Sequence, residues 1–212
     1  MAVPLSSREV ARTLADYQVE LPPPALTQLA AYLELLLRWN RRMNLTGLRD
    51  PQAILRRLFG ESLYLSRVVE LRGWLVDIGS GAGFPGLALK LVAPDLQVTL
   101  IESRRRKCAF LKEVVRECVF SGVDVVSGRF EQWLEGRGEK GKADIITTRA
   151  VNVRPRLLVQ IQQLLDPSGR AVFVTTGALA GQIRGLSSAW RWEKEWLVPP
   201  DTRRIVLVGR LL

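Results

Sequence analysis

The stretch Leu75–Gly86, which reads LVDIGSGAGFPG, decides the fold of this chain. An apolar run ends in Asp77, four glycines follow within eight residues, and an apolar helical run from Leu87 to Ala93 comes next. Glycine adopts positive φ angles and lets a ligand approach the bare backbone. The first amides of the following helix would point at that ligand. The stretch therefore predicts a strand, a loop and a helix that hold a nucleotide-type cofactor.

After this stretch, strand-like runs alternate with helical segments, which is typical of a parallel sheet built from βαβ units. Two further strand-like runs, 192–198 and 204–208, predict an antiparallel hairpin at the C-terminal end. The predicted fold class is α/β: a Rossmann-like, doubly wound, mostly parallel sheet. The expected strands are 74–78, 97–101, 123–126, 144–147 and 171–175, and the expected helices are 86–93, 105–120, 131–134 and 154–165.

Residues 1–72 read as a helical extension of this sheet domain. Apolar residues at three- and four-residue spacing over 26–40 predict a long helix that ends at Asn44, and a shorter helix is expected over 7–17. Asp50 followed by Pro51 is typical of a helix start, and that helix should run to about residue 70. We therefore divide the chain into an N-terminal helical extension, 1–72, and a cofactor-binding domain, 73–212.

Charge and composition restrict the possible functions. The chain has 31 basic and 21 acidic residues, a net charge of +10, and this excess favours a nucleic acid partner over a protein that is merely basic. It has no histidine, which excludes histidine-based triads, metal sites and general bases. Cys108 and Cys118 do not show the spacing of a metal site. No metal is expected.

The sequence also predicts where the protein works. No apolar run approaches the ~20 residues that a membrane span needs, and the first residues lack the charged-then-apolar order of a signal peptide. Two cysteines in one helical segment fit a reduced protein. We expect a cytoplasmic protein with no membrane contact and no obligate protein partner.

The glycine loop leaves two cofactors to consider. The G-x-G-x-x-G pattern of residues 81–86 also occurs in proteins that bind NAD, and alone it is a weak signal. Three features favour S-adenosylmethionine: Asp77 ends the strand, Gly79, Gly81 and Gly83 alternate, and Glu102 ends the next strand. Glu102 is placed to accept hydrogen bonds from ribose hydroxyls, which both cofactors need. An NAD-dependent oxidoreductase remains the alternative.

Further candidates follow the third and fourth strands, because ligands bind outside the carboxyl ends of strands in such sheets. Phe130 would flank an adenine, and a backbone amide or Glu131 would meet its polar edge, but Phe130 and Glu131 are interpreted equally well as a core aromatic and a solvated acid. Arg149 would face a carboxylate of the cofactor or a phosphate of nucleic acid. A surface ion pair is the other interpretation of Arg149.

Two basic clusters are candidate RNA contacts. Four consecutive cations begin the helix expected at 105–120, where they oppose the helix dipole. RNA phosphates would explain them, although runs of charge are often only a solvated face. The second cluster lies near the helical extension. The RNA-binding candidates are Arg104, Arg105, Arg106, Lys107, Arg49 and Arg57.

Several short motifs of the chain resemble those of the ribosomal RNA small subunit methyltransferase G family, also called glucose-inhibited division protein B. The resemblance runs from about Leu36 to Gly177. It rests on several short motifs: Asn44–Thr46, Arg49–Pro51, Asp77–Gly86, Glu102–Ser103, Lys107, Phe110–Leu111 and Arg149–Ala150.

The resemblance implies a class I methyltransferase fold with an N-terminal helical extension. It implies S-adenosylmethionine as methyl donor, S-adenosylhomocysteine as product, and N7 of one guanine in 16S rRNA as acceptor, in free rRNA or in the small ribosomal subunit. The residues that match the family's cofactor contacts are Gly79, Phe84, Phe130, Glu131 and Arg149, and those that match its strand-end acids are Asp77 and Glu102.

The resemblance also bears on catalysis. Guanine N7 carries a lone pair and no proton, so no catalytic acid or base is expected, and Arg149 is a candidate only for positioning. The chain departs from the family pattern at Leu58 and Glu61, where a histidine and an aspartate are usual, and at Thr176, where a lysine is usual. A basic RNA-binding protein with a vestigial methyltransferase fold is therefore the second alternative.

Overall fold

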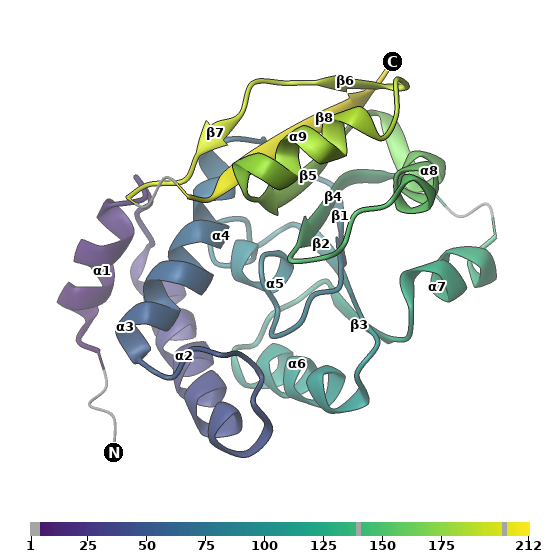
Figure 1. Cartoon of the computed structure of the whole chain (residues 1–212). Helices are drawn as coiled ribbons and strands as arrows, with labels where there is room; N and C mark the ends of the chain where they lie inside the picture. Colours follow the sequence, from purple (N-terminus) through teal and green to yellow (C-terminus); the bar gives the residue numbers. More distant parts are fainter. Residues whose placement is uncertain (1–4, 139–140, 201–202) are drawn as a thin grey trace.

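The computed structural model describes residues 5–138, 141–200 and 203–212. The start of the predicted extension, 1–4, lies outside the described residues, as do 139–140 and 201–202. One mixed sheet forms the centre of the molecule (Figure 1). Its strands are β1 Trp74–Ile78, β2 Gln97–Glu102, β3 Val123–Ser127, β4 Ala143–Arg149, β5 Leu165–Thr175, β6 Trp190–Trp192, β7 Trp196–Leu197 and β8 Ile205–Leu211.

The strand order is β3–β2–β1–β4–β5–β8–β6, with β7 also paired to β8. Strands β1 to β5 are mutually parallel, and β8 runs antiparallel to β5 and to its partners β6 and β7. The direction of the strand order reverses between β1 and β4. Ligands of doubly wound sheets bind outside the carboxyl ends of the strands at such a reversal. The predicted fold class is confirmed.

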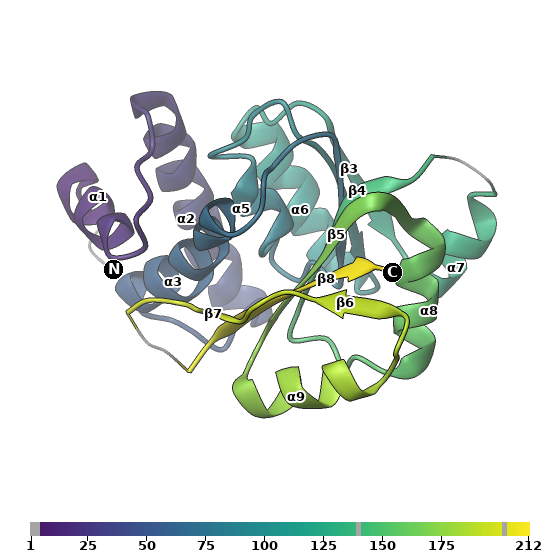
Figure 2. The ribbon, with the colours of Figure 1, turned by 90° about the horizontal axis from the view of Figure 1, so that it is seen from above.

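Helices cover both faces of the sheet. Figure 2 shows α1, α2, α3, α5 and α6 on one side and α7, α8 and α9 on the other. Side chains alternate between the two layers, as the two-residue period of a strand requires: Val172 and Val174 join the first core, and Ala171 and Phe173 join the second. The helices are α1 Ser7–Ala15, α2 Pro23–Met43, α3 Pro51–Ile54, α4 Glu61–Leu63, α5 Gly86–Leu89, α6 Arg105–Glu117, α7 Phe130–Gly136, α8 Pro155–Leu164 and α9 Gly177–Gly185.

The helical extension packs on the sheet domain through one shared hydrophobic core. Tyr32 of α2 is fully buried, and its hydroxyl donates a hydrogen bond of 2.5 Å to the carbonyl oxygen of Ala82 in the glycine loop. The Tyr32 ring stacks on Phe84 with centroids 5.4 Å apart, and Phe59 meets Phe84 edge-on. The extension therefore supports the cofactor loop, while the boundary at residue 72 stays a prediction.

Several elements differ from the sequence prediction. The helix expected over 50–70 is interrupted by a π-helix, Leu55–Gly60, and ends in a 3₁₀ turn, Tyr64–Arg67. The helix expected to reach Ala93 ends at Leu89, and the first strand of the expected hairpin is split into β6 and β7. Helix α9 was not predicted, because only Ala180 and Ile183 of its nine residues are buried and the apolar pattern is correspondingly weak.

Candidate functional site

The glycine loop between β1 and α5 has the backbone that its sequence predicts. Gly79, Gly81 and Gly83 have φ angles of 74°, 60° and 91°, in the left-handed region that favours glycine. The amides of Gly79 and Ser80 both donate to the carbonyl oxygen of Ile101 in β2, at 2.9 and 3.1 Å. The loop is thereby fixed to the carboxyl end of the neighbouring strand.

Asp77 lies beneath the loop and is fully buried. One carboxylate oxygen accepts a hydrogen bond of 2.7 Å from the Thr147 hydroxyl of β4, and the other accepts one of 3.1 Å from the Gly86 amide at the start of α5. Asp77 thus joins β1, β4 and α5 at the reversal of the strand order. It is not among the residues that line the cavity described below.

Burial raises the pKa of Asp77 from 3.8 to about 6, although its hydrogen bonds with Thr147 and Gly86 oppose the shift. Between these two pH values the native state holds a proton that the unfolded chain has lost. The contribution of Asp77 to stability is therefore greatest below pH 4 and is lost as the pH rises to about 6. This pKa difference corresponds to about 3 kcal/mol in the free energy of unfolding.

We expect Asp77→Asn to remove this pH dependence. The free energy of unfolding of the original chain minus that of the variant should fall by about 2 kcal/mol between pH 4 and pH 6.5. Urea denaturation of both proteins across this range measures the difference, in which the titration of all other groups cancels. A difference that stays constant with pH would contradict the raised pKa of Asp77.

Glu102 ends β2 beside the loop and is 6% exposed. Its carboxylate accepts hydrogen bonds from the amides of Gly81 and Arg104, at 3.0 and 2.8 Å. Each carboxylate oxygen has a second lone pair, and the neighbours Ile101 and Ser103 both line the cavity. The predicted role of Glu102 in binding ribose hydroxyls is compatible with this arrangement and stays a prediction.

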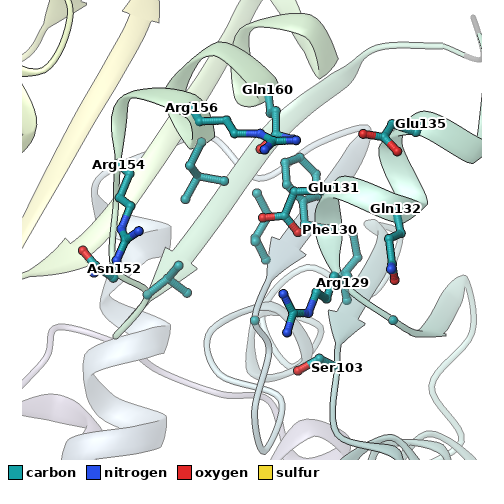
Figure 3. Close-up of a pocket in the computed structure, with 16 residues that line it drawn as sticks. Ser103, Arg129, Phe130, Glu131, Gln132, Glu135, Asn152, Arg154, Arg156 and Gln160 are labelled. Carbon is teal, nitrogen blue, oxygen red and sulfur yellow. The ribbon is translucent and has the colours of Figure 1, made fainter.

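A cavity of about 640 Å³ opens at the carboxyl ends of β1, β2 and β3, next to the glycine loop (Figure 3). Its walls come from Gly79, from the start of α7 and from the segment that leads into α8. Of the predicted cofactor residues, Gly79, Phe130 and Glu131 line it, whereas Asp77, Gly81, Gly83, Phe84, Glu102 and Arg149 do not. Phe130 is both a lining residue and a core residue, with 4% of its surface exposed.

Phe84 faces the helical extension instead of the cavity. Its ring is 6% exposed and packs between Tyr32 and Phe59. Sequence patterns do not separate a ligand-facing aromatic from one that anchors a neighbouring helix. The loop is thus held from one side by aromatic packing and from the other by β2.

Arg149 at the end of β4 is held by the segment that contains the π-helix. Its guanidinium forms an ion pair of 2.7 Å with Glu61, and both side chains are about nine-tenths buried, with 11% and 8% exposed. It also donates to the carbonyl oxygen of Arg57 and, at 3.3 Å, to the hydroxyl of Ser62. The ion pair of Arg149 is therefore buried, whereas the sequence suggested one on the surface. The role of Arg149 in positioning the cofactor stays a prediction.

The predicted RNA-binding residues are exposed, apart from Lys107. Arg104, Arg105 and Arg106 are exposed at the start of α6, and Lys107 is partly buried beside Gly81. Arg49 and Arg57 are exposed on the extension. The structure thus places the first cluster directly after the loop that follows β2.

Sequence reasoning missed the wall of the cavity that α8 supplies. Gln160 is 8% exposed, and its side-chain oxygen is buried without a hydrogen-bond partner. Figure 3 shows Gln160 with Arg156 on α8, across the cavity from Phe130 and Glu131 on α7. The sequence does not reveal this position of Gln160, because the α7 residues that share the cavity with it are far away in the chain.

Within the described parts of the chain, no group of three or more histidine, cysteine, aspartate or glutamate side chains is arranged to hold a metal ion. Among those same residues, no helix has the length and apolar character to cross a bilayer. Both cysteines are free and buried.

The strand order and the loop geometry define a class I methyltransferase fold. Solved structures agree with this assignment. The superposition on MtNAS covers 99% of this chain and 90% of the MtNAS chain, with 13% sequence identity and a TM-score of 0.62. The ribosomal protein L11 methylase of Lactobacillus delbrueckii subsp. bulgaricus covers 74% of this chain and 79% of its own, with 13% identity and a TM-score of 0.58. At this identity, the likeness shows the fold alone.

The chain belongs to the rRNA small subunit methyltransferase G family, whose sequence profile matches residues 25–197. The ribosomal RNA small subunit methyltransferase G of Halorhodospira halophila is 41% identical over 156 residues, which cover 74% of this chain and 72% of that protein. The protein of the same name from Chloroflexus aggregans is 36% identical over 174 residues, which cover 78% and 73%. The resemblance deduced from the sequence is confirmed, and neither alternative function gains support.

Proposed function

We propose that this chain transfers a methyl group from S-adenosylmethionine to N7 of a guanine in 16S rRNA. Membership of the rRNA small subunit methyltransferase G family supports the reaction and the class of acceptor. One structural observation carries the proposal: a cavity at the carboxyl ends of β1 to β3 has the bare backbone of Gly79 in its wall.

The residues of the cavity fit the cofactor. A Cβ atom at Gly79 would lie 2.9 Å from the side chain of Val151, another residue of the cavity wall, so a larger residue at this position would disturb that wall. Phe130 offers an apolar wall for an adenine, and the unpartnered oxygen of Gln160 offers an acceptor for its exocyclic amino group. We assign the ribose to Glu102, whose neighbour Ser103 lines the cavity. When bound, S-adenosylmethionine supplies a methyl group on a positively charged sulfur.

The chain's own contribution is positional. N7 of guanine needs no deprotonation, so the site requires no general base, in keeping with a chain without histidine. The glycine loop, fixed by Ile101 from β2 and by Tyr32 from α2, gives the donor one orientation. Alignment of this kind can supply ~7–11 kcal/mol of a barrier. We assign Asp77 and Arg149 to holding that alignment.

Transfer of tritium from labelled S-adenosylmethionine tests the proposal. We expect the purified protein to label 16S rRNA, either free or in the small subunit, at a single guanine. Scission of the rRNA chain at the labelled nucleotide after borohydride reduction and aniline treatment, which cleaves at N7-methylguanosine, would place the methyl group at N7. No transfer to either substrate, or transfer to another position of the base, would overturn the proposal.

We expect Gln160→Leu to weaken cofactor binding while it stabilises the free protein. A buried acceptor that has no hydrogen-bond partner destabilises the native state by about 1–3 kcal/mol, and the variant removes this acceptor. The same change deletes a hydrogen bond to the adenine amino group, so S-adenosylhomocysteine should bind about tenfold more weakly. Denaturation and calorimetry measure the two effects, which should have opposite signs.

A deaminated ligand and a matched variant complete this test. S-inosylhomocysteine lacks the amino group, so the original chain should prefer S-adenosylhomocysteine and Gln160→Leu should lose much of that preference. Gln163→Leu, on the exposed face of the same helix, should change neither property. An unaltered preference in Gln160→Leu would remove Gln160 from the adenine site.

We expect the exposed arginines at the start of α6 to contact RNA phosphates. Reversal of Arg104, Arg105 and Arg106 to glutamate should weaken rRNA binding, and the slope of log affinity against log salt should become shallower by about 2–3. As a control, a second triple variant carries glutamate in place of three exposed arginines outside α6, and it therefore has the same net charge. These control positions are Arg8, Arg12 and Arg191. Equal effects of the two triple variants would show that net charge, and not this cluster, governs binding.

We also propose a cytoplasmic location. The proposed acceptor, rRNA, is a cytoplasmic molecule. The two free, buried cysteines fit a reducing compartment. Fractionation of the cells that express the protein measures this directly, with ribosomal particles as the marker.

A further inference from the structure

Three exposed arginines line the opening of the cavity assigned to the cofactor. Arg129 precedes α7, and Arg154 and Arg156 lie at the start of α8, on the other side of the cavity (Figure 3). Within the described parts of the chain, none of these three side chains has an ion-pair or hydrogen-bond partner. By contrast, Arg38 on α2 forms an ion pair of 2.7 Å with Glu113. The three guanidinium groups at the opening are therefore available to a ligand.

The cofactor does not account for all of this charge. S-adenosylmethionine has one carboxylate, which a single arginine can bind, and it also carries an ammonium group and a positively charged sulfur. Glu131 and Glu135 line the same cavity, but neither forms an ion pair with a described arginine at the opening. At least two of the three guanidinium groups are thus left for a different anion.

The start of α8 favours an anion at the same place. Arg154 precedes the first turn, Arg156 lies in that turn, and the turn contains no acidic residue. Cations are unfavourable at this end of a helix, whereas its amides without a partner attract anions. Helices α1 and α3 have the usual arrangement, in which Ser6 and Asp50 accept a hydrogen bond from an amide of the first turn. An anion between Arg154 and Arg156 would offset the unfavourable charge.

Gln160 gives independent evidence for a ligand beneath these arginines. It follows Arg156 by four residues, so the two side chains lie on the same face of α8. Gln160 is 8% exposed, and its side-chain oxygen has no hydrogen-bond partner among the described residues. We assign this oxygen to the adenine of the cofactor. Figure 3 shows Arg156 beside Gln160, and Arg156 is exposed. A phosphate held by Arg156 would therefore lie over the bound cofactor.

Basic residues flank the glycine loop on both sides. Along the carboxyl edge of the sheet the strand order is β3, β2, β1, β4, and the glycine loop follows β1. Helices α7, α6 and α8 follow β3, β2 and β4. An arginine precedes each of these helices: Arg129, Arg104 and Arg154. A polyanion that contacts arginines on both sides of the glycine loop must therefore cross the opening of the cofactor cavity.

We propose that Arg154 and Arg156 bind a phosphate of the rRNA, and that the RNA chain then closes the cavity over the cofactor. The inference rests on the proposed function, which supplies rRNA as the source of the phosphate. A guanidinium group binds a phosphate through paired hydrogen bonds, which fix the position of the RNA as well as hold it. Closure imposes an order of binding. S-adenosylmethionine enters before the rRNA, and S-adenosylhomocysteine leaves after it.

The release of tritium-labelled S-adenosylhomocysteine tests the closure. With a saturating amount of the form of 16S rRNA that the protein methylates, release from the original chain should be about tenfold slower than without RNA. Arg154→Glu combined with Arg156→Glu should bind S-adenosylhomocysteine with an affinity within about twofold of the original, and saturating rRNA should slow its release less than about threefold. Inorganic phosphate should not slow release from either protein, because only a chain spans the opening.

Arg8→Glu combined with Arg12→Glu is the matched control, with the same net charge. Both residues are exposed on α1, which Figure 1 and Figure 2 show on the far side of the molecule from α7 and α8. This control should keep the full delay. If the glutamate variant of α8 does not fold, glutamine at the same two positions, Arg154→Gln with Arg156→Gln, replaces it.

Four results would overturn the inference. These are no delay by rRNA in the original chain, a delay caused by inorganic phosphate alone, a full delay in the α8 variant, and an equal loss of the delay in the α1 and α8 variants. Each of these results is compatible with methyl transfer to rRNA. Absence of transfer by the original chain would instead overturn the proposed function.

Discussion

Gly83→Ala should lower the free energy of unfolding by about 4 kcal/mol, whereas Gly81→Ala should cost roughly 1–2 kcal/mol. Both glycines have positive φ angles, so both substitutions strain the backbone. They differ in the space available: a Cβ atom at Gly83 would lie 2.2 Å from the Tyr32 hydroxyl and 3.0 Å from Leu87. At Gly81 the nearest atom, the Lys107 ammonium nitrogen, is 3.8 Å away.

The difference between these two variants isolates the support that α2 gives to the loop. Tyr32 is fully buried, so it can move away from an alanine only by giving up its hydrogen bond to Ala82 and its packing on Phe84. Urea denaturation gives the two free energies. Equal losses would show that backbone strain alone matters and that Tyr32 does not hold the loop.

Arg149→Met should destabilise the protein by about 3–5 kcal/mol, because it leaves the Glu61 carboxylate buried without its nearest cation. The side chain of Arg204, at 3.8 Å, compensates only in part. Replacing both partners removes the buried charge as well as the ion pair. Arg149→Met combined with Glu61→Met should therefore recover about half of the loss. Denaturation of both single variants and the double variant completes the cycle.

The double variant also tests the predicted role of Arg149 toward the cofactor. Once stability is recovered, a loss of S-adenosylhomocysteine affinity beyond tenfold supports a positioning role for Arg149. Unchanged affinity would assign Arg149 to the link between β4 and the π-helix segment. Strictly additive free energies in the cycle would contradict the coupling between Arg149 and Glu61.

The parallel sheet and the glycine loop could be predicted because their signals are local. The apolar run before Asp77 and the glycines at 79, 81 and 83 each express a backbone requirement in consecutive residues. The expected strands correspond to β1 through β5 for the same reason. Helix α9 lacked such a signal because its buried face is small.

The direction in which site residues face could not be predicted from the sequence. Asp77 and Phe84 lie in the loop motif, but Asp77 points beneath the loop to Thr147 and Phe84 packs against Tyr32. Gln160 lines the cavity although it is 30 residues from Phe130 in the chain. These arrangements depend on contacts between distant segments, and one sequence does not record such contacts.

A crystal structure of the complex with S-adenosylhomocysteine tests the central claim most directly. We expect the adenine between Phe130 and the α8 wall, with the amino group toward Gln160, and the homocysteine end over Gly79. Density for S-adenosylhomocysteine away from the glycine loop and the cavity beside Phe130 would contradict the account.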